Sequence, residues 1–318
     1  MFLVTSLPAA ILLCVVTMLG WGSWANTQKL AGKEKWPFEL FYWDYAAGSA
    51  LGTVLLAWAF DDPTSVLTAN PSSLWQAAAA GVVFNLANLL LVAAIAMAGL
   101  AVAFPVAIGT ALIVGTVLTF IVDRKGAPLG LALGVALASI AVLCCAAAYR
   151  AQARELKVTR KGVIVCLVSG LLMASWAPLA AASMQKVPGA LSPLSSLAVF
   201  GAAALLSTIP FNLYLMRKPM VGAPVFMRDY FAGGLRWHLL GLLGGCIWTI
   251  GTASNLVAGS SVGFAVSYAI GQSAPLVASL WGIFVWKEFA GAGPASVRAL
   301  AAMFFFYLAA IGVLARAI

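Results

Sequence analysis

Charged residues are scarce in this chain: of its 318 residues, 8% are charged and 63% are hydrophobic. An average soluble domain has roughly a quarter of its residues charged. So few charges cannot cover a surface that faces water, and the mean hydropathy of +1.03 indicates that the solvent is a lipid bilayer. The composition therefore excludes a soluble globular domain and predicts an integral membrane protein.

Residues that serve common catalytic and metal sites are also few. The single histidine, His238, lies at the edge of an apolar segment beside Arg236 and is interpreted as an interfacial side chain. Five cysteines lie inside apolar segments without CxxC spacing, which predicts neither a disulfide framework nor a zinc site. The sequence contains no GxxxxGK[ST] and no HExxH motif. We therefore expect no enzymatic activity, no cofactor and no metal.

Long apolar runs are what the chain has in abundance. A helix needs about 20 largely apolar residues to cross a bilayer. On this criterion the sequence predicts an all-α fold with ten transmembrane helices, at residues 5–26, 38–60, 74–97, 99–121, 128–149, 162–183, 191–215, 236–257, 262–286 and 296–316. The first run lacks a basic segment and a cleavage site, so we interpret it as a span and not as a signal peptide.

The distribution of lysine and arginine predicts the orientation of the spans. Fourteen of these residues fall in the loops after the odd-numbered spans, and four fall in the remaining loops and the C-terminus. Because basic residues collect on the cytoplasmic side, both termini are expected outside. The net charge of +9 then reflects membrane insertion, so no nucleic-acid partner is expected.

Two pairs of similar segments indicate an internal repeat. Residues 14–25 (CVVTMLGWGSWA) match residues 166–177 (CLVSGLLMASWA), and residues 101–110 match residues 263–272. Five spans per half is an odd number, so the second half must cross the membrane in the opposite direction, as in many secondary transporters. The expected organisation is a five-helix repeat at 1–150, a cytoplasmic linker at 151–161 and an inverted repeat at 162–318.

The densest group of aromatic and polar residues lies between Thr17 and Tyr45. On a helix, Trp21 and Trp24 share a face with Thr17 and Gln28, and a face with these polar groups is not suited to lipid. An interfacial aromatic belt is the alternative. Trp176, the repeat counterpart of Trp24, lies deeper than such a belt, so Trp24 and Trp176 are predicted to face each other across a cavity.

Amides and hydroxyls in other spans complete the predicted site. Asn85 and Asn88 lie three residues apart in the third span, where hydrogen bonding between helices is the alternative interpretation. Such groups suit a neutral polar solute. The predicted substrate-binding residues are Trp21, Trp24, Asn85, Asn88, Trp176, Trp248, Asn255, Tyr268 and Gln272.

Asp44 is the one carboxylate well inside an expected span. An ionisable residue at this depth usually faces a cavity or a partner, which makes Asp44 the predicted coupling residue. The alternative is a structural ion pair with Lys29 or Lys35 near the interface.

The segments GWGSWANTQKLAGK, FELFYWDY and IFVWKEF resemble bacterial members of the ureide permease family. That family is related to the glucose/ribose porter and rhamnose–proton symporter families in the drug/metabolite transporter superfamily. The resemblance implies a ten-helix importer of ureides, nucleobases or sugars, commonly coupled to protons. The chain lacks the large central loop of the plant members, so regulation through that loop is not expected.

The sequence thus predicts a secondary active transporter in the bacterial inner membrane. It would import a small neutral polar metabolite, a ureide or nucleobase first and a monosaccharide second, with a proton or sodium as the coupling ion. Two alternatives stay open: an exporter of drugs or amino-acid metabolites, and a membrane receptor or assembly protein that transports nothing.

Overall fold

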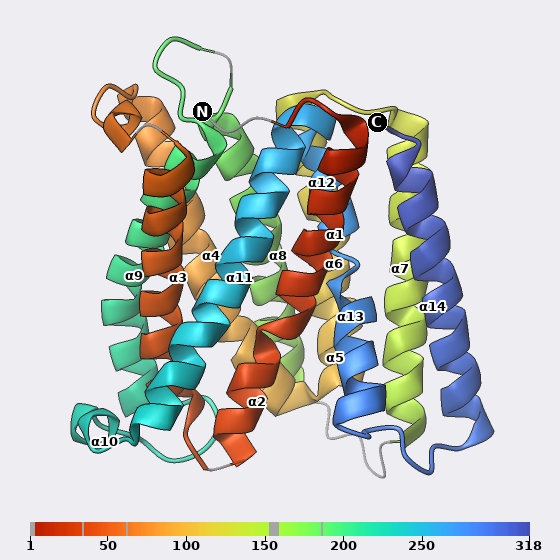
Figure 1. The fold of residues 1–318 in the computed structure, drawn as a ribbon. Helices are drawn as coiled ribbons and strands as arrows, with labels where there is room; N and C mark the ends of the chain where they lie inside the picture. The colour runs from red at the N-terminus through yellow and green to blue at the C-terminus, as the bar shows by residue number, and fades with distance from the viewer. Residues whose placement is uncertain (1–3, 34, 62, 153–158, 186) are drawn as a thin grey trace.

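The computed structural model describes residues 4–33, 35–61, 63–152, 159–185 and 187–318, and these residues contain helices and no strand. The helices lie roughly side by side, with both termini at the same end of the molecule (Figure 1). The α-helices are α1 Leu7–Ser23, α2 Ala25–Lys33, α3 Phe38–Phe60, α4 Pro71–Ala98, α5 Leu100–Ala103, α6 Gly109–Asp123, α7 Pro128–Gln152, α8 Arg160–Ser183, α9 Pro193–Arg217, α10 Met227–Phe231, α11 Leu235–Val262, α12 Phe264–Gly271, α13 Ala274–Leu280 and α14 Pro294–Ala315. A 3₁₀-helix, η1, and two π-helices, η2 and η3, occupy Pro63–Val66, Phe104–Ile108 and Trp281–Val285.

Nine helical segments in the described part of the chain are long and apolar enough to cross a membrane. They include α1 with most of α2, at Leu7–Gly32, and α12 to η3, at Phe264–Val285. The predicted span 38–60 coincides with the 23-residue helix α3, which is not among the nine. Most of the expected linker 151–161, namely residues 153–158, lies outside the described residues.

Several long helices begin at a side chain that caps the N-terminus. The first backbone N–H groups of a helix have no carbonyl partner within it, so a Ser, Thr or Asn oxygen supplies one. Asn70 accepts from Ser72 N at 2.8 Å at the start of α4, and Thr159 accepts from Gly162 N at 3.0 Å at the start of α8. Pro71 and Pro193 occupy the first positions of α4 and α9, where a missing N–H costs nothing.

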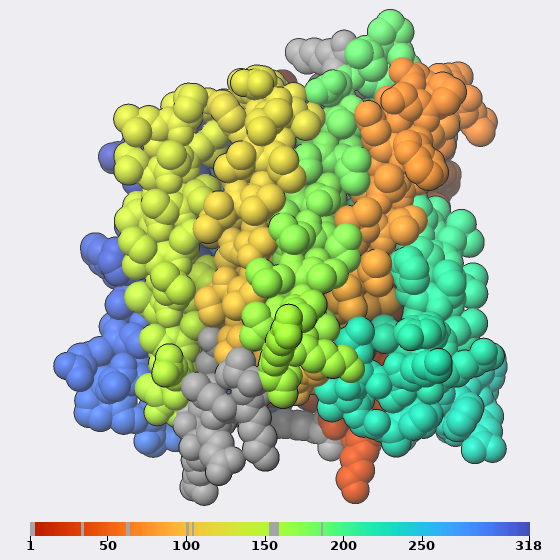
Figure 2. Space-filling view, turned by 180° about the vertical axis from the view of Figure 1, so that it is seen from behind, coloured from red at the N-terminus to blue at the C-terminus, as the bar shows by residue number. Residues whose placement is uncertain are grey.

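The helices of the two halves interleave. α1 packs on α11, α8 packs on α4, α3 packs on both α9 and α11, and α7 packs on α14. Seen from behind, α7, α6, α8, α4 and α9 follow one another across the surface (Figure 2). Gly20 and Gly251 allow α1 and α11 to approach closely, because a Cβ on Gly20 would lie 2.8 Å from Gly251 Cα.

Two of the expected spans are interrupted. The span expected at 99–121 contains α5, the π-helix η2 with Pro105, and α6. The span expected at 262–286 breaks after α12, at Gln272 and Ser273, before α13 begins. Interrupted helices leave backbone groups unpaired, which a membrane tolerates where they line protein or a cavity. The second break places Gln272 beside the site described below.

Apolar side chains cover much of the outer surface. Leu51, Val54 and Leu55 of α3 are all about half exposed, as are many residues on the other long helices. A water-soluble protein of this size would not expose so many large apolar side chains together. This surface is suited to acyl chains.

Candidate functional site

A cavity of about 290 Å³ lies between helices of both halves of the chain. Its walls come from α1, α2, α4, η2, α7, α8, α11 and α13, together with Gln272 and the turn after η3. It extends from Trp176 and Trp248, within their helices, to Lys29 of α2 and Glu288, at the end of the molecule opposite the termini (Figure 1). The cavity is therefore a recess that reaches from inside the bundle toward this end.

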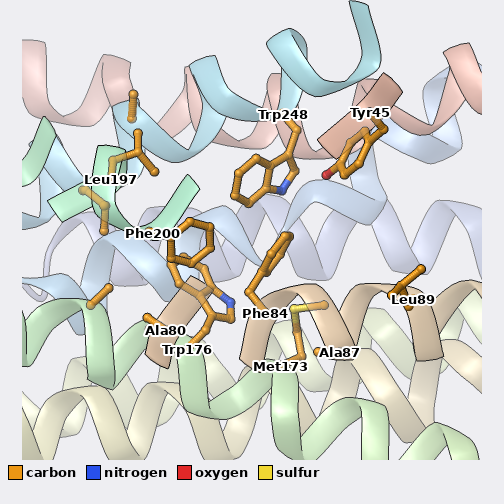
Figure 3. Packing of buried hydrophobic residues seen from close by; sticks show 14 of the residues in the cluster. Tyr45, Ala80, Phe84, Ala87, Leu89, Met173, Trp176, Leu197, Phe200 and Trp248 are labelled. Carbon is orange, nitrogen blue, oxygen red and sulfur yellow. The ribbon is translucent and has the colours of Figure 1, made fainter. Parts of the chain in front are cut away.

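Aromatic rings form the inner part of this cavity. Trp21 and Trp176 meet edge to face with centroids 5.9 Å apart, and Phe84 packs against Trp248 at 4.5 Å. Figure 3 shows Phe84, Trp176 and Trp248 converging with Phe200 and Met173 between the helices. Trp21 Nε1 donates to Thr252 Oγ1 at 2.9 Å, which fixes that indole. Aromatic surfaces held in this way suit stacking of a planar solute.

The predicted pairing of Trp24 with Trp176 takes a different form in the structure. Both residues line the cavity, but Trp21 is the tryptophan that contacts Trp176. Trp24 packs on Tyr45 instead, with centroids 4.8 Å apart. The structure thus brings Trp21, Trp24, Trp176 and Trp248 to one cavity.

Of the predicted amides, Asn88 and Gln272 line the cavity. Asn88 Nδ2 donates to Tyr42 OH at 3.3 Å. Both amides are therefore placed to contact a solute in the cavity.

Three other predicted residues lie away from the cavity lining and are engaged within the protein. Asn85 donates to Ser207 Oγ at 2.8 Å and accepts from the Tyr42 hydroxyl at 2.8 Å. Asn255 Nδ2 donates to the carbonyl of Ser267 at 2.9 Å. Tyr268 donates to the carbonyl of Ala111 at 3.1 Å and packs on Trp21 and Trp176. In the structure these three side chains connect helices.

Asp44 lies outside the cavity lining and is 5% exposed. The hydroxyl of Tyr230, in α10, donates to Asp44 Oδ1 at 2.7 Å, and His238 Nδ1 lies 2.8 Å from Oδ2. Burial, together with the hydrogen bond to Asp44, raises the pKa of the Tyr230 hydroxyl above its ordinary value, so Tyr230 remains a donor at neutral pH. Lys29, one alternative partner considered for Asp44, is paired with Glu288 instead.

The cavity also contains residues that sequence reasoning did not assign to it. Lys29, Tyr149, Trp286 and Glu288 line its outer part, and Phe84 lines its inner part. Trp286 and Glu288 lie in the segment IFVWKEF, whose resemblance to family members was the one signal that pointed to them.

At the opposite end of the bundle, hydrogen bonds join helix ends and connecting residues of the two halves. Asp123 Oδ2 accepts from Phe264 N at 2.8 Å, and Lys125 Nζ donates to the carbonyl of Ser260 at 3.0 Å. Gln185 Nε2 donates to the carbonyl of Val122 at 3.0 Å. These contacts tie the two halves together at the end away from the cavity.

The lining offers stacking surfaces, amides, a hydroxyl and one ion pair, which are groups for binding a solute and not for covalent chemistry. No group of three or more His, Cys, Asp or Glu side chains that could hold a metal ion occurs among the described residues. The long apolar helices and the apolar outer surface define a multi-pass membrane protein.

Comparison with known proteins identifies its family. A model of the ureide permease family matches residues 157–317, about half of the chain, so the chain belongs to that family and the resemblance is confirmed. Ureide permease 2 of Arabidopsis thaliana is 22% identical, over 99% of this chain and 98% of its own length. Ureide permease 5 of the same plant is 28% identical over 36% of this chain and 28% of its own length.

A protein of known crystal structure, one of several matches, has a similar fold. It aligns with a TM-score of 0.67 over 97% of this chain and 98% of its own, at 19% sequence identity. At that identity the likeness shows the fold alone.

Proposed function

We propose that this protein is a secondary active transporter that imports a small, neutral, polar metabolite, with a ureide as the first candidate. The observation that carries the proposal is the cavity, which combines five tryptophans with the amides of Asn88 and Gln272. Flat faces and amide edges match a ureide or a nucleobase, and a monosaccharide is the next candidate. The names of the two plant relatives support the ureide class.

Ten spans in two inverted repeats are part of this proposal. With 23 residues, α3 is about 34 Å long, enough to cross a hydrocarbon core of about 30 Å. Its exposed Leu51, Val54 and Leu55 are suited to lipid, which supports α3 as the tenth span. The repeats would comprise residues 1–150 and 162–318, joined by the linker 151–161.

The pattern of helix contacts supports the repeat. If α1 corresponds to α8 and α4 corresponds to α11, the packing of α1 on α11 is the counterpart of the packing of α8 on α4. In the same way α3 on α11 corresponds to α9 on α4. Exchanged contacts of this kind are expected when two similar bundles are related by a two-fold axis in the membrane plane.

A recess that reaches one end of the bundle fits alternating access. The excess of basic residues would place the end with Lys29 and Glu288 in the cytoplasm of a bacterium and both termini outside its inner membrane. The recess would then be open inward, while the contacts of Asp123, Lys125 and Gln185 hold the outer end together. Import would require these contacts to break and the inner end to close.

Asp44 is the proposed coupling residue, with a proton as the first candidate ion and sodium as the second. Asp44 contacts Tyr230 and His238 and does not line the cavity. Coupling would therefore act through the packing of α3 and α11. Proton loss or gain at this cluster would change how α10 and α11 are held to α3.

Ligand binding and transport in purified protein test the proposal. A solute that binds the folded state raises the melting temperature, so ureides, nucleobases and monosaccharides are compared in one screen. Hits are then tested for accumulation in proteoliposomes with and without a proton gradient. Accumulation of a ureide supports the proposal. Gradient-driven efflux alone indicates an exporter, and binding without transport under any gradient indicates a receptor, and either result overturns it.

A further inference from the structure

Two charged side chains lie among the described residues that line the cavity, and they contact each other. Lys29 Nζ pairs with Glu288 Oε1. Their side chains are 39% and 28% exposed, so both remain accessible from the recess. The pair cancels the charge of the lining at the point where a solute enters or leaves.

Local structure holds Glu288 in this place. Lys287 adopts a left-handed conformation with φ of 52°, which turns the chain back after the π-helix η3. Glu288 N donates to the carbonyl of Gly282 at 2.8 Å, and a Cβ at Gly282 would lie 2.7 Å from Glu288 Oε2. Tyr149 OH donates to Glu288 Oε2 at 3.0 Å.

Lys29 is held as firmly from the other side. Its ammonium lies 4.7 Å from the centroid of the Trp286 ring, a distance typical of a cation–π contact. Trp286 Nε1 donates to Asn26 Oδ1, one turn before Lys29 on α2. The ammonium is thus oriented toward Glu288 and the cavity mouth.

We propose that the Lys29–Glu288 pair is the charge filter of the cavity, and that it selects solutes with no net charge. A solute with a carboxylate would have to break the Lys29–Glu288 ion pair to bind Lys29, and it would then lie beside the carboxylate of Glu288. A cation would have to take Glu288 from Lys29. A neutral ureide pays neither cost, because it binds through its amide edges and its faces. The filter deepens the proposed function and rests on it for the identity of the solute.

Replacing one partner of the pair should shift the preference toward a charged solute. The sign of the preferred charge depends on which partner is replaced. Glu288→Gln removes the carboxylate that pairs with the Lys29 ammonium, which can then donate to a carboxylate of the solute. Lys29→Met leaves Glu288 as an acceptor for a cation. The double variant Lys29→Met/Glu288→Gln restores a lining without net charge. A structural clamp between α2 and the turn after η3 would be broken in all three variants alike, so the sign of the preference distinguishes a filter from a clamp.

The first experiment uses a matched pair of ligands, hydantoin and its ring-opened carboxylate N-carbamoylglycine. We expect the native protein to bind hydantoin and not the carboxylate, and Glu288→Gln to gain carboxylate binding by about tenfold. Lys287→Met, which removes a positive charge next to Glu288 outside the cavity lining, is the control and should leave the preference unchanged. Equal binding of both ligands by the native protein overturns the filter.

A second experiment does not depend on the identity of the solute. Ala278→Cys introduces a thiol into the cavity wall, one turn before Gly282, and no native cysteine is among the described lining residues. Its modification by anionic, cationic and neutral methanethiosulfonates is timed in each background, with Thr68→Cys at the opposite end of the molecule as the control. We expect Glu288→Gln to raise the rate at which the anionic reagent modifies the Ala278→Cys thiol by about tenfold. Lys29→Met should raise the rate of the cationic reagent at the same thiol by about tenfold, and neither variant should change the rates at Thr68→Cys.

The two experiments separate the two proposals. If the thiol rates change as expected but hydantoin does not bind, the filter stands and the ureide assignment fails. If hydantoin binds but the thiol rates are the same in all backgrounds, the filter is overturned and the ureide assignment stands.

Discussion

Trp21 of α1 and Trp176 of α8 meet with their ring planes at 74° and their centroids 5.9 Å apart. One tryptophan comes from each half of the chain. Trp21 is also fixed by its hydrogen bond to Thr252, and Trp176 by ring contacts with Phe84 and Phe200. The inner surface of the cavity is therefore rigid, and a solute would meet a preformed aromatic surface.

Trp24 is the tryptophan whose removal should affect the ligand most and the fold least. Its indole lines the cavity, packs on Tyr45 and makes no side-chain hydrogen bond with the described residues. We expect Trp24→Ala to weaken ureide binding by about tenfold, since a stacking surface is lost. Isothermal titration in detergent measures this change. Trp58→Ala on the exposed face of α3 is the control, and equal effects of the two variants would contradict the role of Trp24.

Asn85 and Asn88 form a matched pair for separating binding from stability. Asn88→Ala removes a cavity amide, so we expect binding to weaken by about tenfold with little change in melting temperature. Asn85→Ala leaves the hydroxyls of Tyr42, Thr208 and Ser207 without this partner. It should lower the free energy of unfolding by about 1 kcal/mol and leave affinity unchanged.

Titration of each variant with the ligand, and thermal unfolding without it, provide the two measurements. If Asn85→Ala abolished binding in a protein of native stability, the ligand would bind nearer to Ser207 than the cavity lining indicates.

The apolar runs predicted most of the fold because lipid allows few alternatives to a helix. The expected spans 38–60 and 162–183 agree with α3 and α8 to within two residues at each end. The break at Gln272 and Ser273 was not predicted, because the length of an apolar run takes no account of the glycine and proline within it. Gly271 precedes the break, and Pro275 lies in the first turn of α13, where it has no N–H with which to continue α12.

The site was harder to predict because it depends on which face of each helix turns inward. Residues three apart on a helix differ by about 60° in direction. This difference separates Trp21, which reaches Trp176, from Trp24, and Asn85 from Asn88. The Lys29–Glu288 pair joins residues 259 positions apart, and no local pattern indicates such a contact.

Gly20 and Gly251 should be indispensable for the packing of α1 on α11. A Cβ on Gly20 would lie 2.8 Å from Gly251 Cα and 2.9 Å from the carbonyl oxygen of Ile247, both backbone atoms that cannot move aside alone. We expect Gly20→Ala to lower the free energy of unfolding by about 1–3 kcal/mol. Gly32→Ala is the matched control, since a Cβ there meets nothing within 4 Å and alanine favours a helix by up to about 1 kcal/mol. A Gly20→Ala protein as stable as Gly32→Ala would mean that α1 and α11 are farther apart than described.

Asp44 should be needed for coupling but not for binding, because it lies outside the cavity lining. We expect Asp44→Asn to bind the ureide with native affinity and to lose accumulation against a gradient, since an amide cannot take up and release the proton. Tyr230→Phe removes the 2.7 Å hydrogen bond but keeps the carboxylate, so it should still couple. Uptake into proteoliposomes with an imposed pH gradient, beside exchange without one, measures the two properties separately. Native accumulation by Asp44→Asn would assign coupling to another residue, whereas loss of both binding and exchange would place Asp44 in contact with the solute. His238→Gln then tests the imidazole, which lies 2.8 Å from the same carboxylate and is the second group in this cluster able to carry the proton.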